Sequence, residues 1–256
     1  MSALLEADGV SKRFGGVLAL DRVSFTIARG EIFGLIGPNG AGKTTLFNVL
    51  TGSYAPDAGS FVFDARNITA LKPHEIAAAG IARTFQNIRL FANLSTLENV
   101  MIGRHVRTRA GVWGAILRNR RTVAEETAIE RRALELLDYV GIRGRANDPA
   151  GSLPYGDQRR LEIARALATE PRLLALDEPA AGMNAAESAA LRRLIESIRQ
   201  GGVTVLLIEH DVRLVMNVCD RVMVLDYGEK IAEGTPLEVQ RDSKVIEAYL
   251  GTPRAA

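Results

Sequence analysis

Apolar and polar residues follow two patterns in the N-terminal part of the chain, where the first 36 residues predict strands. Residues 23–27 alternate with a period of two, which is typical of a half-buried strand, whereas residues 32–36 form a continuous apolar run, typical of a strand buried on both faces. A glycine-rich turn follows this run. The apolar spacing then predicts a helix at 43–50, a strand at 59–63 and a short helix at 72–79.

The pattern changes at about residue 87, and helical spacing alone continues to residue 155, with helices predicted at 99–104 and 122–140. After Gly156 strands and helices alternate again. The predicted order is a helix at 158–168, a strand at 173–176, a helix at 185–199, a strand at 203–208, a helix at 212–218 and a strand at 222–225. Strands separated by helices in this way indicate βαβ units, so we expect an α/β core with a mostly parallel sheet, interrupted by a helical insert.

Composition narrows the class of protein. The chain has 256 residues, of which 47% are apolar and 24% charged, as in an ordinary globular protein. No run approaches the 18 apolar residues of a membrane span, and acids in the first residues argue against a signal peptide. One cysteine, Cys219, and three scattered histidines favour neither a disulfide framework nor a metal cluster, which fits a reducing cytoplasm. The net charge of +2 gives no general field for nucleic acid, and we expect no nucleic-acid partner.

Residues 37–44 read Gly-Pro-Asn-Gly-Ala-Gly-Lys-Thr and match the phosphate-binding pattern G-x-x-x-x-G-K-[ST]. Glycines allow successive N–H groups to surround phosphate oxygens, and the helix that begins near Gly42 directs its positive end at the same anion. A chance glycine turn is the alternative, but the flanking strand and helix argue against it. The expected nucleotide-binding residues are Gly37, Pro38, Asn39, Gly40, Ala41, Gly42, Lys43, Thr44 and Thr45, with Lys43 on the β- and γ-phosphates and Thr44 on Mg²⁺.

Two carboxylates follow the apolar strand at 173–176. Asp177 stands at the carboxyl end of a parallel strand, where ligands bind in open α/β sheets, and it suits a direct or indirect role at Mg²⁺. Glu178 points elsewhere and suits polarisation of a water for attack on the γ-phosphate. Acids also simply end buried strands, but a phosphate-binding loop in the same chain favours the functional interpretation.

The order of these motifs resembles that in the nucleotide-binding subunits of ATP-binding cassette (ABC) transporters, and the resemblance extends from about residue 4 to 250. Gln86, within Arg-Thr-Phe-Gln-Asn, stands where that family has a glutamine that contacts Mg²⁺ and water. Residues 153–158, Leu-Pro-Tyr-Gly-Asp-Gln, stand at the family signature, and His210 follows a strand like the family's switch histidine. Phe14 takes the place of the aromatic that stacks on adenine, although a core aromatic and a structural histidine are the plain alternatives for Phe14 and His210.

The resemblance implies one nucleotide-binding domain over residues 1–256. Its fold would be a phosphate-loop NTPase core at 1–86 and 157–250 with a mostly parallel sheet and an N-terminal antiparallel β subdomain. A helical subdomain at 87–156 and a short tail at 251–256 would complete it. ATP and Mg²⁺ would be the cofactors. The catalytic residues would be Glu178, His210, Gln86 and Lys43; the metal ligands Thr44, Gln86 and Asp177; and the further nucleotide contacts Phe14, Gln86, His210, Tyr155, Gly156 and Asp157.

The signature departs from the family's usual Leu-Ser-Gly-Gly-Gln. Pro154 replaces the serine whose hydroxyl reaches the γ-phosphate bound by the opposite subunit, and proline has neither a hydroxyl nor an N–H. Tyr155 stands in place of the first glycine. Gly156 and a helix N-terminus near Asp157 remain, so the contact across the dimer would depend on the backbone. Whether Asn184 contacts the second subunit of the dimer is left open.

The resemblance implies an ATP-hydrolysing subunit that dimerises with itself or a paralogue and drives two transmembrane permease subunits, with a periplasmic solute-binding protein acting indirectly. It would lie peripherally at the cytoplasmic face of the inner membrane. Phrases such as Leu-Ile-Glu-His-Asp look most like importers of branched-chain or other hydrophobic amino acids. Alternatives are urea or amide importers, the lipopolysaccharide exporter, a soluble non-transport ABC ATPase and a small-molecule kinase. An expected basic hairpin at 106–121 would be either a solvated face or a contact for permease loops or lipid headgroups.

Overall fold

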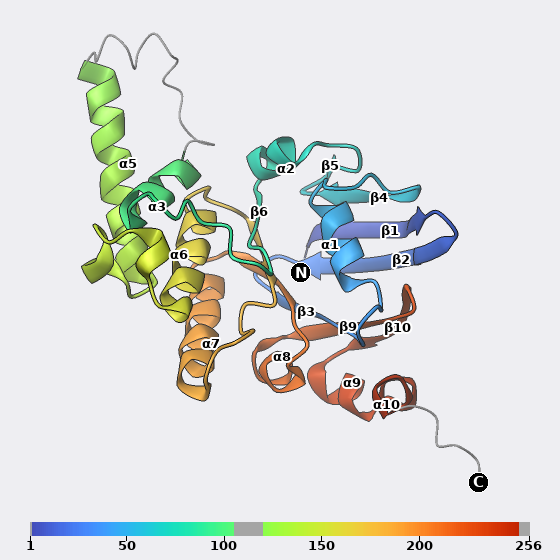
Figure 1. Ribbon diagram of the computed structural model, residues 1–256. Coiled ribbons are helices and arrows are strands. Elements are labelled where there is room, and N and C mark those ends of the chain that lie inside the picture. Colours follow the sequence, from blue (N-terminus) through green and yellow to red (C-terminus); the bar gives the residue numbers. More distant parts are fainter. Residues whose placement is uncertain (1, 105–119, 251–256) are drawn as a thin grey trace. The chain divides into compact units, whose positions relative to one another are not determined.

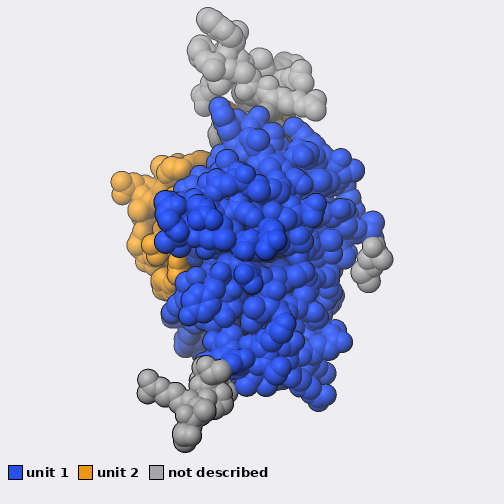
Figure 2. Space-filling model, turned by 90° about the vertical axis from the view of Figure 1, so that its right-hand side faces the viewer, with its two compact units in different colours: residues 1–76, 175–256 blue, residues 77–174 orange. Residues whose placement is uncertain are grey.

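The computed structural model describes residues 2–104 and 120–250, which fall into two compact units (Figure 2). Unit 1 comprises residues 1–76 and 175–256, and unit 2 comprises residues 77–174. The helical insert predicted at 87–156 lies within unit 2, while the basic hairpin predicted at 106–121 lies almost entirely outside the described residues.

Unit 1 contains an antiparallel sheet of four strands in the order β2-β1-β4-β5 (Figure 1). The strands are β1 (Ala3–Phe14), β2 (Val17–Ala28), β4 (Ala58–Phe63) and β5 (Arg66–Asn67). Alternate residues of β2, among them Val23, Phe25 and Ile27, are buried, as their period of two predicts. The antiparallel N-terminal subdomain is therefore confirmed.

The second sheet of unit 1 runs β10-β9-β3-β8-β7, and β3 pairs in parallel with both β8 and β9. The strands are β3 (Ile32–Ile36), β7 (Leu173–Asp177), β8 (Thr204–Ile208), β9 (Arg221–Asp226) and the antiparallel edge strand β10 (Glu229–Gly234). Every residue of β3, β7 and β8 is buried, which explains their continuous apolar runs. The α/β class with a mostly parallel core sheet is confirmed.

Five helices of unit 1 accompany this sheet: α1 (Lys43–Leu50), α7 (Ala185–Gln200), α8 (Val212–Val218), α9 (Pro236–Arg241) and α10 (Ser243–Leu250). The sequence interpretation missed β10, α9 and α10. A signal for α9 was present, because Thr235, Pro236 and Glu238 form a capping box with proline in the first turn.

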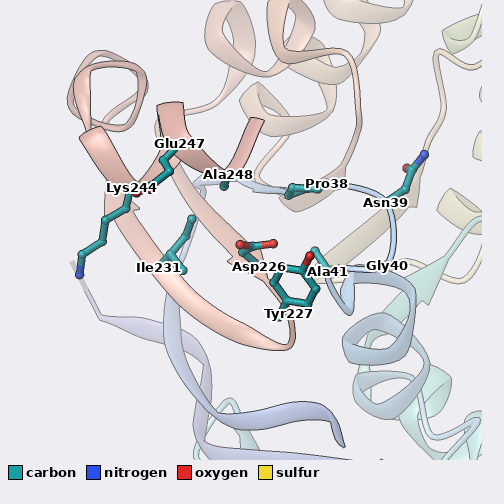
Figure 3. A pocket seen from close by; sticks show the side chains of 10 residues that line it. All are labelled: Pro38, Asn39, Gly40, Ala41, Asp226, Tyr227, Ile231, Lys244, Glu247 and Ala248. Atoms are coloured by element: carbon teal, nitrogen blue, oxygen red, sulfur yellow. The ribbon is translucent and has the colours of Figure 1, made fainter. Parts of the chain in front are cut away.

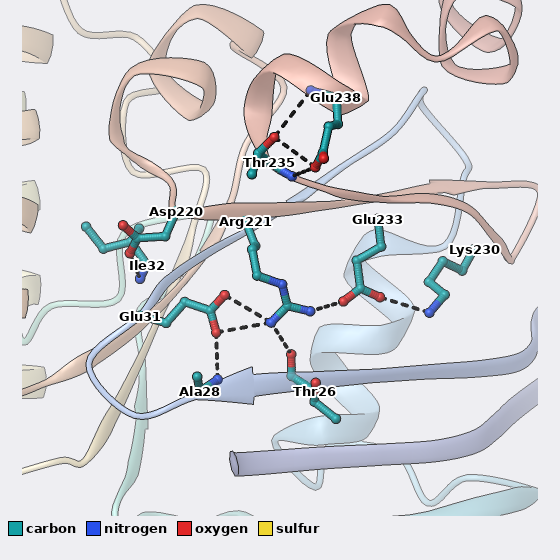
Figure 4. Close-up of polar contacts among 10 residues, drawn as sticks. All are labelled: Thr26, Ala28, Glu31, Ile32, Asp220, Arg221, Lys230, Glu233, Thr235 and Glu238. Atoms are coloured by element: carbon teal, nitrogen blue, oxygen red, sulfur yellow. Dashed lines mark hydrogen bonds and ion pairs between the residues drawn. The ribbon is translucent and has the colours of Figure 1, made fainter. Parts of the chain in front are cut away.

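Arg221 of β9 joins the two sheets of unit 1 (Figure 4). Its guanidinium contacts the carboxylate of Glu31 at 3.1 Å, that of Glu233 on β10, and the carbonyl of Thr26 on β2. Glu31 is buried and also accepts the N–H of Ala28 at 2.6 Å. A buried carboxylate in this position depends on its partners, and Arg221 thereby links β9 and β10 of one sheet to β2 of the other.

Unit 2 is mostly helical, with α3 (Thr96–Arg104), α5 (Arg120–Tyr139) and α6 (Tyr155–Leu167) packed against one another, and 3₁₀ turns at Arg143–Arg145 and Ala150–Ser152. The helix α2 (Pro73–Ala79) leads into it, and the short strand β6 (Ile81–Arg83) follows Gly80, whose carbonyl accepts the N–H groups of Arg172 and Leu173. Helix α6 begins at Tyr155, not at 158 as expected, because the carbonyl of Pro154 already accepts the N–H groups of Asp157 and Gln158.

Candidate nucleotide site

The phosphate-binding loop joins β3 to α1 and is held by close backbone packing. A Cβ on Gly37 would lie 2.1 Å from the carbonyl oxygen of Leu225, and one on Gly42, at φ +102°, would lie 2.6 Å from that of Ala19. Only glycine fits at these two positions. The loop therefore packs too closely against the backbone of its neighbours to accept a side chain at either position.

Lys43 is buried, and its Nζ donates to the carbonyls of Gly37 at 2.7 Å and Pro38 at 2.9 Å. Burial lowers the pKa of this ammonium, while the charges of Glu178 and Asp177 raise it. The acidic end of β7 and the loop lysine therefore act on each other electrostatically, although 134 positions separate Lys43 from Asp177. Thr44 is exposed and Thr45 half-buried at the start of α1, and Asp177 is buried.

Glu178 has an unusual backbone conformation at the end of β7. Its φ is +47°, in the left-handed region, and its N–H donates to the carbonyl of Ile208 at the end of β8, 2.9 Å away. Such conformations cost free energy in non-glycine residues and concentrate at functional sites. The Glu178 side chain, 19% exposed, places Oε2 3.6 Å from Nδ1 of His210. The structure thus brings together two residues that the sequence separates by a helix and a strand.

Glu209 is a residue that the sequence interpretation missed. Its side chain is fully buried; Oε1 accepts the N–H of Ala180 at 2.9 Å, and Oε2 accepts that of His210 at 3.2 Å. Burial raises the pKa of this carboxyl, and the backbone donors lower it. Glu209 therefore ties the segment after Glu178 to the segment that carries His210. The only signal in the sequence was an acid directly after a five-residue apolar strand.

Phe14 ends β1 and is 42% exposed, so it is not a core aromatic. Its ring meets that of Tyr54 edge-on, with centroids 5.2 Å apart and planes at 76°, and the Lys12 ammonium lies 5.5 Å from its centroid. An exposed aromatic face held by a second ring can accept a flat base. Tyr54 was not foreseen.

A cavity of about 490 Å³ lies beside the loop in unit 1 (Figure 3). Its lining combines loop residues with the β9–β10 turn and α10: Pro38, Asn39, Gly40, Ala41, Asp226, Tyr227, Ile231, Lys244, Glu247 and Ala248. Lys43, Thr44, Asp177 and Glu178 do not line it. This cavity is therefore a neighbour of the expected phosphate site and shares only the loop with it.

The remaining expected site residues belong to unit 2. The backbone carbonyl of Gln86 accepts a hydrogen bond from Nη2 of Arg159, and Tyr155, Gly156 and Asp157 form the first turn of α6. Asp157 pairs with Arg145 at 3.0 Å and lies 3.8 Å from Arg160.

Asn184, which the sequence left open as a dimer contact, is the N-cap of α7. Its Oδ1 accepts the N–H groups of Ala186 at 2.9 Å and Glu187 at 3.0 Å, and the Glu187 carboxylate accepts the N–H of Asn184. The Asn184 side chain therefore makes these hydrogen bonds within its own subunit, as part of a capping box.

A family model described as "ABC transporter" matches residues 20–181, and one described as "Branched-chain amino acid ATP-binding cassette transporter" matches residues 229–255. The high-affinity branched-chain amino acid transport ATP-binding protein LivG of Salmonella typhimurium is 44% identical over 249 residues, covering 97% of this chain and 98% of LivG.

Two further relatives extend this comparison. The lipopolysaccharide export system ATP-binding protein LptB of Escherichia coli is 38% identical over 249 residues, with the same coverage of 97% and 98%. The crystal structure of the ADP conformation of MJ1267, an ATP-binding cassette of an ABC transporter, matches with a TM-score of 0.85 at 32% identity, covering 98% of this chain and all of that one.

Proposed function

The chain belongs to the ABC transporter family of ATP-binding proteins, and we propose that it powers an importer of branched-chain or other hydrophobic amino acids. Its role is that of an energy-coupling ATPase, as in the family. The amino-acid class rests on one observation, the 44% identity to LivG over nearly the whole of both chains. A urea or amide importer is the alternative within importers, and the lipopolysaccharide exporter is a weaker one because LptB is less similar.

The proposed chemistry uses the residues of unit 1 for binding and attack. The loop N–H groups and Lys43 hold the phosphates, and the exposed face of Phe14 supports the adenine. Glu178 polarises the attacking water, and His210, 3.6 Å from its carboxylate, contacts the γ-phosphate. Catalysis is then mainly positioning and stabilisation of charge on the transferred phosphoryl group.

The donors at α1 and β7 fit Mg²⁺. Thr44 supplies an exposed hydroxyl and Asp177 a carboxylate, and Mg²⁺ typically takes one or two protein oxygens and completes its shell with phosphates and water. Among the described residues, no group of three or more His, Cys, Asp or Glu side chains is placed to hold a metal. The family resemblance adds the side-chain amide of Gln86 as a further candidate ligand. When bound, Mg²⁺ would neutralise charge on the phosphate oxygens.

Cassettes of this family dimerise and work with transmembrane permeases. In the described part of this chain, no helix has the length and apolar character to cross a bilayer. We propose that the chain pairs with a copy of itself or a paralogue on two permease subunits, at the cytoplasmic face of the inner membrane. A periplasmic binding protein would act on it only through the permeases.

The test is reconstitution of this chain with its permease subunits in proteoliposomes. Binding protein loaded with leucine is expected to stimulate ATP hydrolysis and drive leucine uptake. If a binding protein loaded with urea or an amide stimulates ATP hydrolysis instead, the proposed solute class, amino acids, is wrong, and the ATPase role stands. Failure of the assembled complex to hydrolyse ATP would overturn the coupling role itself.

A further inference from the structure

Arg159 of α6 is almost completely buried; its side chain is 3% exposed. Every nitrogen of the guanidinium donates a hydrogen bond. Nη1 bonds the carbonyl of Phe85 at 2.7 Å, and Nη2 bonds the carbonyl of Gln86. Nε and Nη2 both bond the hydroxyl of Tyr155, at 3.1 and 2.8 Å. Arg159 therefore touches the segment of Gln86 and the first turn of α6 at the same time.

Glu162 completes the group one turn further along α6. Its Oε1 accepts the N–H of Phe85 at 3.2 Å, and its Oε2 lies 3.4 Å from Nη1 of Arg159. Both side chains are buried, so each charge depends on the other and on the backbone between Phe85 and Gln86. The pair thus clamps that backbone through an N–H and two carbonyls.

Tyr155 stands where the family signature usually has glycine, and its contacts with Arg159 explain this difference. The distance from its ring centroid to Cζ of the Arg159 guanidinium is 5.3 Å. Its hydroxyl accepts two of the five hydrogen bonds that the guanidinium donates. A glycine at 155 would leave two buried donors without this acceptor. The departure in the signature and the buried arginine are therefore parts of one arrangement.

We propose that Arg159 is a positioning residue that couples the two nucleotide sites of the dimer. Gln86 serves the site of its own subunit, whereas the first turn of α6 meets the nucleotide held by the partner, so this inference rests on the proposed function. Because one guanidinium fixes both segments, a shift of α6 on meeting the partner's nucleotide moves the backbone of Gln86. Occupancy of one site is thereby felt at the other, which is the requirement for cooperative hydrolysis.

The variant that tests this coupling is Tyr155→Phe, which keeps the ring over the guanidinium and removes only the hydroxyl. The guanidinium keeps its hydrogen bonds to the carbonyls of Phe85 and Gln86 and to the carboxylate of Glu162, so we expect the variant to fold. In the assembled complex the Hill coefficient for ATP is expected to fall toward 1, and the ATP concentration for half-maximal hydrolysis to rise about five-fold. ATP affinity of the isolated chain, measured by equilibrium binding, is expected to stay unchanged because the partner's site is absent.

Two further variants separate coupling from stability. Arg159→Lys keeps the charge beside Glu162 but cannot span both segments, so it is expected to lose the same cooperativity. Tyr139→Phe makes the identical change on α5 at 43% exposure and is expected to leave the Hill coefficient at the wild-type value. Wild-type cooperativity in both Tyr155→Phe and Arg159→Lys would overturn the inference. Hydrolysis without cooperativity in the wild-type complex would likewise overturn the inference, whereas failure of the wild-type chain to dimerise with ATP and its partner would overturn the proposed dimer.

Discussion

The N-termini of α1 and α6 share the lack of a side-chain cap and differ in their electrostatics. Neither helix has a side-chain cap: Gly42 precedes α1 and Pro154 precedes α6. Both therefore present N–H groups of the kind that bind anions. The first turn of α1 contains Lys43 and no acid, whereas that of α6 contains Asp157. An anion meets a favourable charge at α1 and an unfavourable one at α6.

The two ends are also held in place by different means. The loop before α1 is shaped mainly by backbone packing against Gly37 and Gly42, and Lys43 adds hydrogen bonds to the carbonyls of Gly37 and Pro38. The first turn of α6 is held by side chains, through Arg159 on Tyr155 and Arg145 on Asp157. We therefore expect α1 to supply nucleotide affinity by itself, and α6 to adjust how tightly two subunits share a nucleotide.

The largest effect is expected from Lys43→Ala, which removes the cation of α1. Loss of charge-assisted hydrogen bonds to phosphate, each about 1.5–3 kcal/mol, should weaken ATP binding by about 100-fold or more. The thermal midpoint should change little, because the hydrogen bonds to the carbonyls of Gly37 and Pro38 are lost while an ammonium whose burial lowers its pKa is removed. Equilibrium binding of ATP to the isolated chain measures the first effect and calorimetry the second.

The control for Lys43→Ala is Lys72→Ala, which removes an exposed lysine from the same unit. It should bind ATP as the wild type does. Unaltered ATP affinity in Lys43→Ala would show that α1 does not supply the affinity and would remove the contrast with α6.

The next effect in size is expected from Glu178→Gln at the end of β7. If Glu178 polarises the attacking water, hydrolysis should fall by about 10²–10⁴-fold while ATP binding persists. The variant should then accumulate as an ATP-bound dimer, because the N-termini of α1 and α6 would still contact the bound nucleotides. Analytical ultracentrifugation with ATP and the partner subunit measures this directly, and a variant that remains monomeric would contradict the proposed cycle.

The difference between the N-termini of α1 and α6 also explains which features could be predicted from the sequence. The loop before α1 was predicted with its flanking strand and helix, because glycine spacing and a buried apolar run are local signals. The arrangement at α6 was not predicted, since the helix begins three residues earlier than expected and Arg159 makes contacts with residues more than seventy positions away. Glu209 was missed for the same reason: its bond to Ala180 spans two secondary-structure elements.

A smaller effect is expected from Asp157→Asn, which removes the acid from the first turn of α6. In the dimer proposed above, this carboxylate would repel the γ-phosphate of the partner's nucleotide, although Arg145 and Arg160 offset part of its charge. The ATP-dependent dimer should tighten by about two- to five-fold, as expected for a helix-end charge of 0.3–1 kcal/mol, and the gain should shrink in high salt. Asp138→Asn, the same change at an exposed site on α5, should leave dimerisation as it is. A weaker dimer in Asp157→Asn would mean that the carboxylate contacts the nucleotide or partner favourably.

The smallest effect is expected from Pro154→Ser, which gives α6 the side-chain cap that both helix ends lack. A serine cap stabilises a helix by about 1 kcal/mol, whereas loss of proline costs about 0.4–1 kcal/mol through the unfolded chain, so the thermal midpoint should change little.

The hydroxyl can accept a helix N–H and still donate to the partner's γ-phosphate. Pro154→Ala loses the same proline without adding a hydroxyl, so the difference between the two variants isolates that hydroxyl. The serine variant should dimerise with ATP about three-fold more tightly than the alanine variant, in line with a net hydrogen bond of about 0.5–1.5 kcal/mol. Equal dimerisation of the two would show that the first turn of α6 meets the nucleotide through its backbone alone.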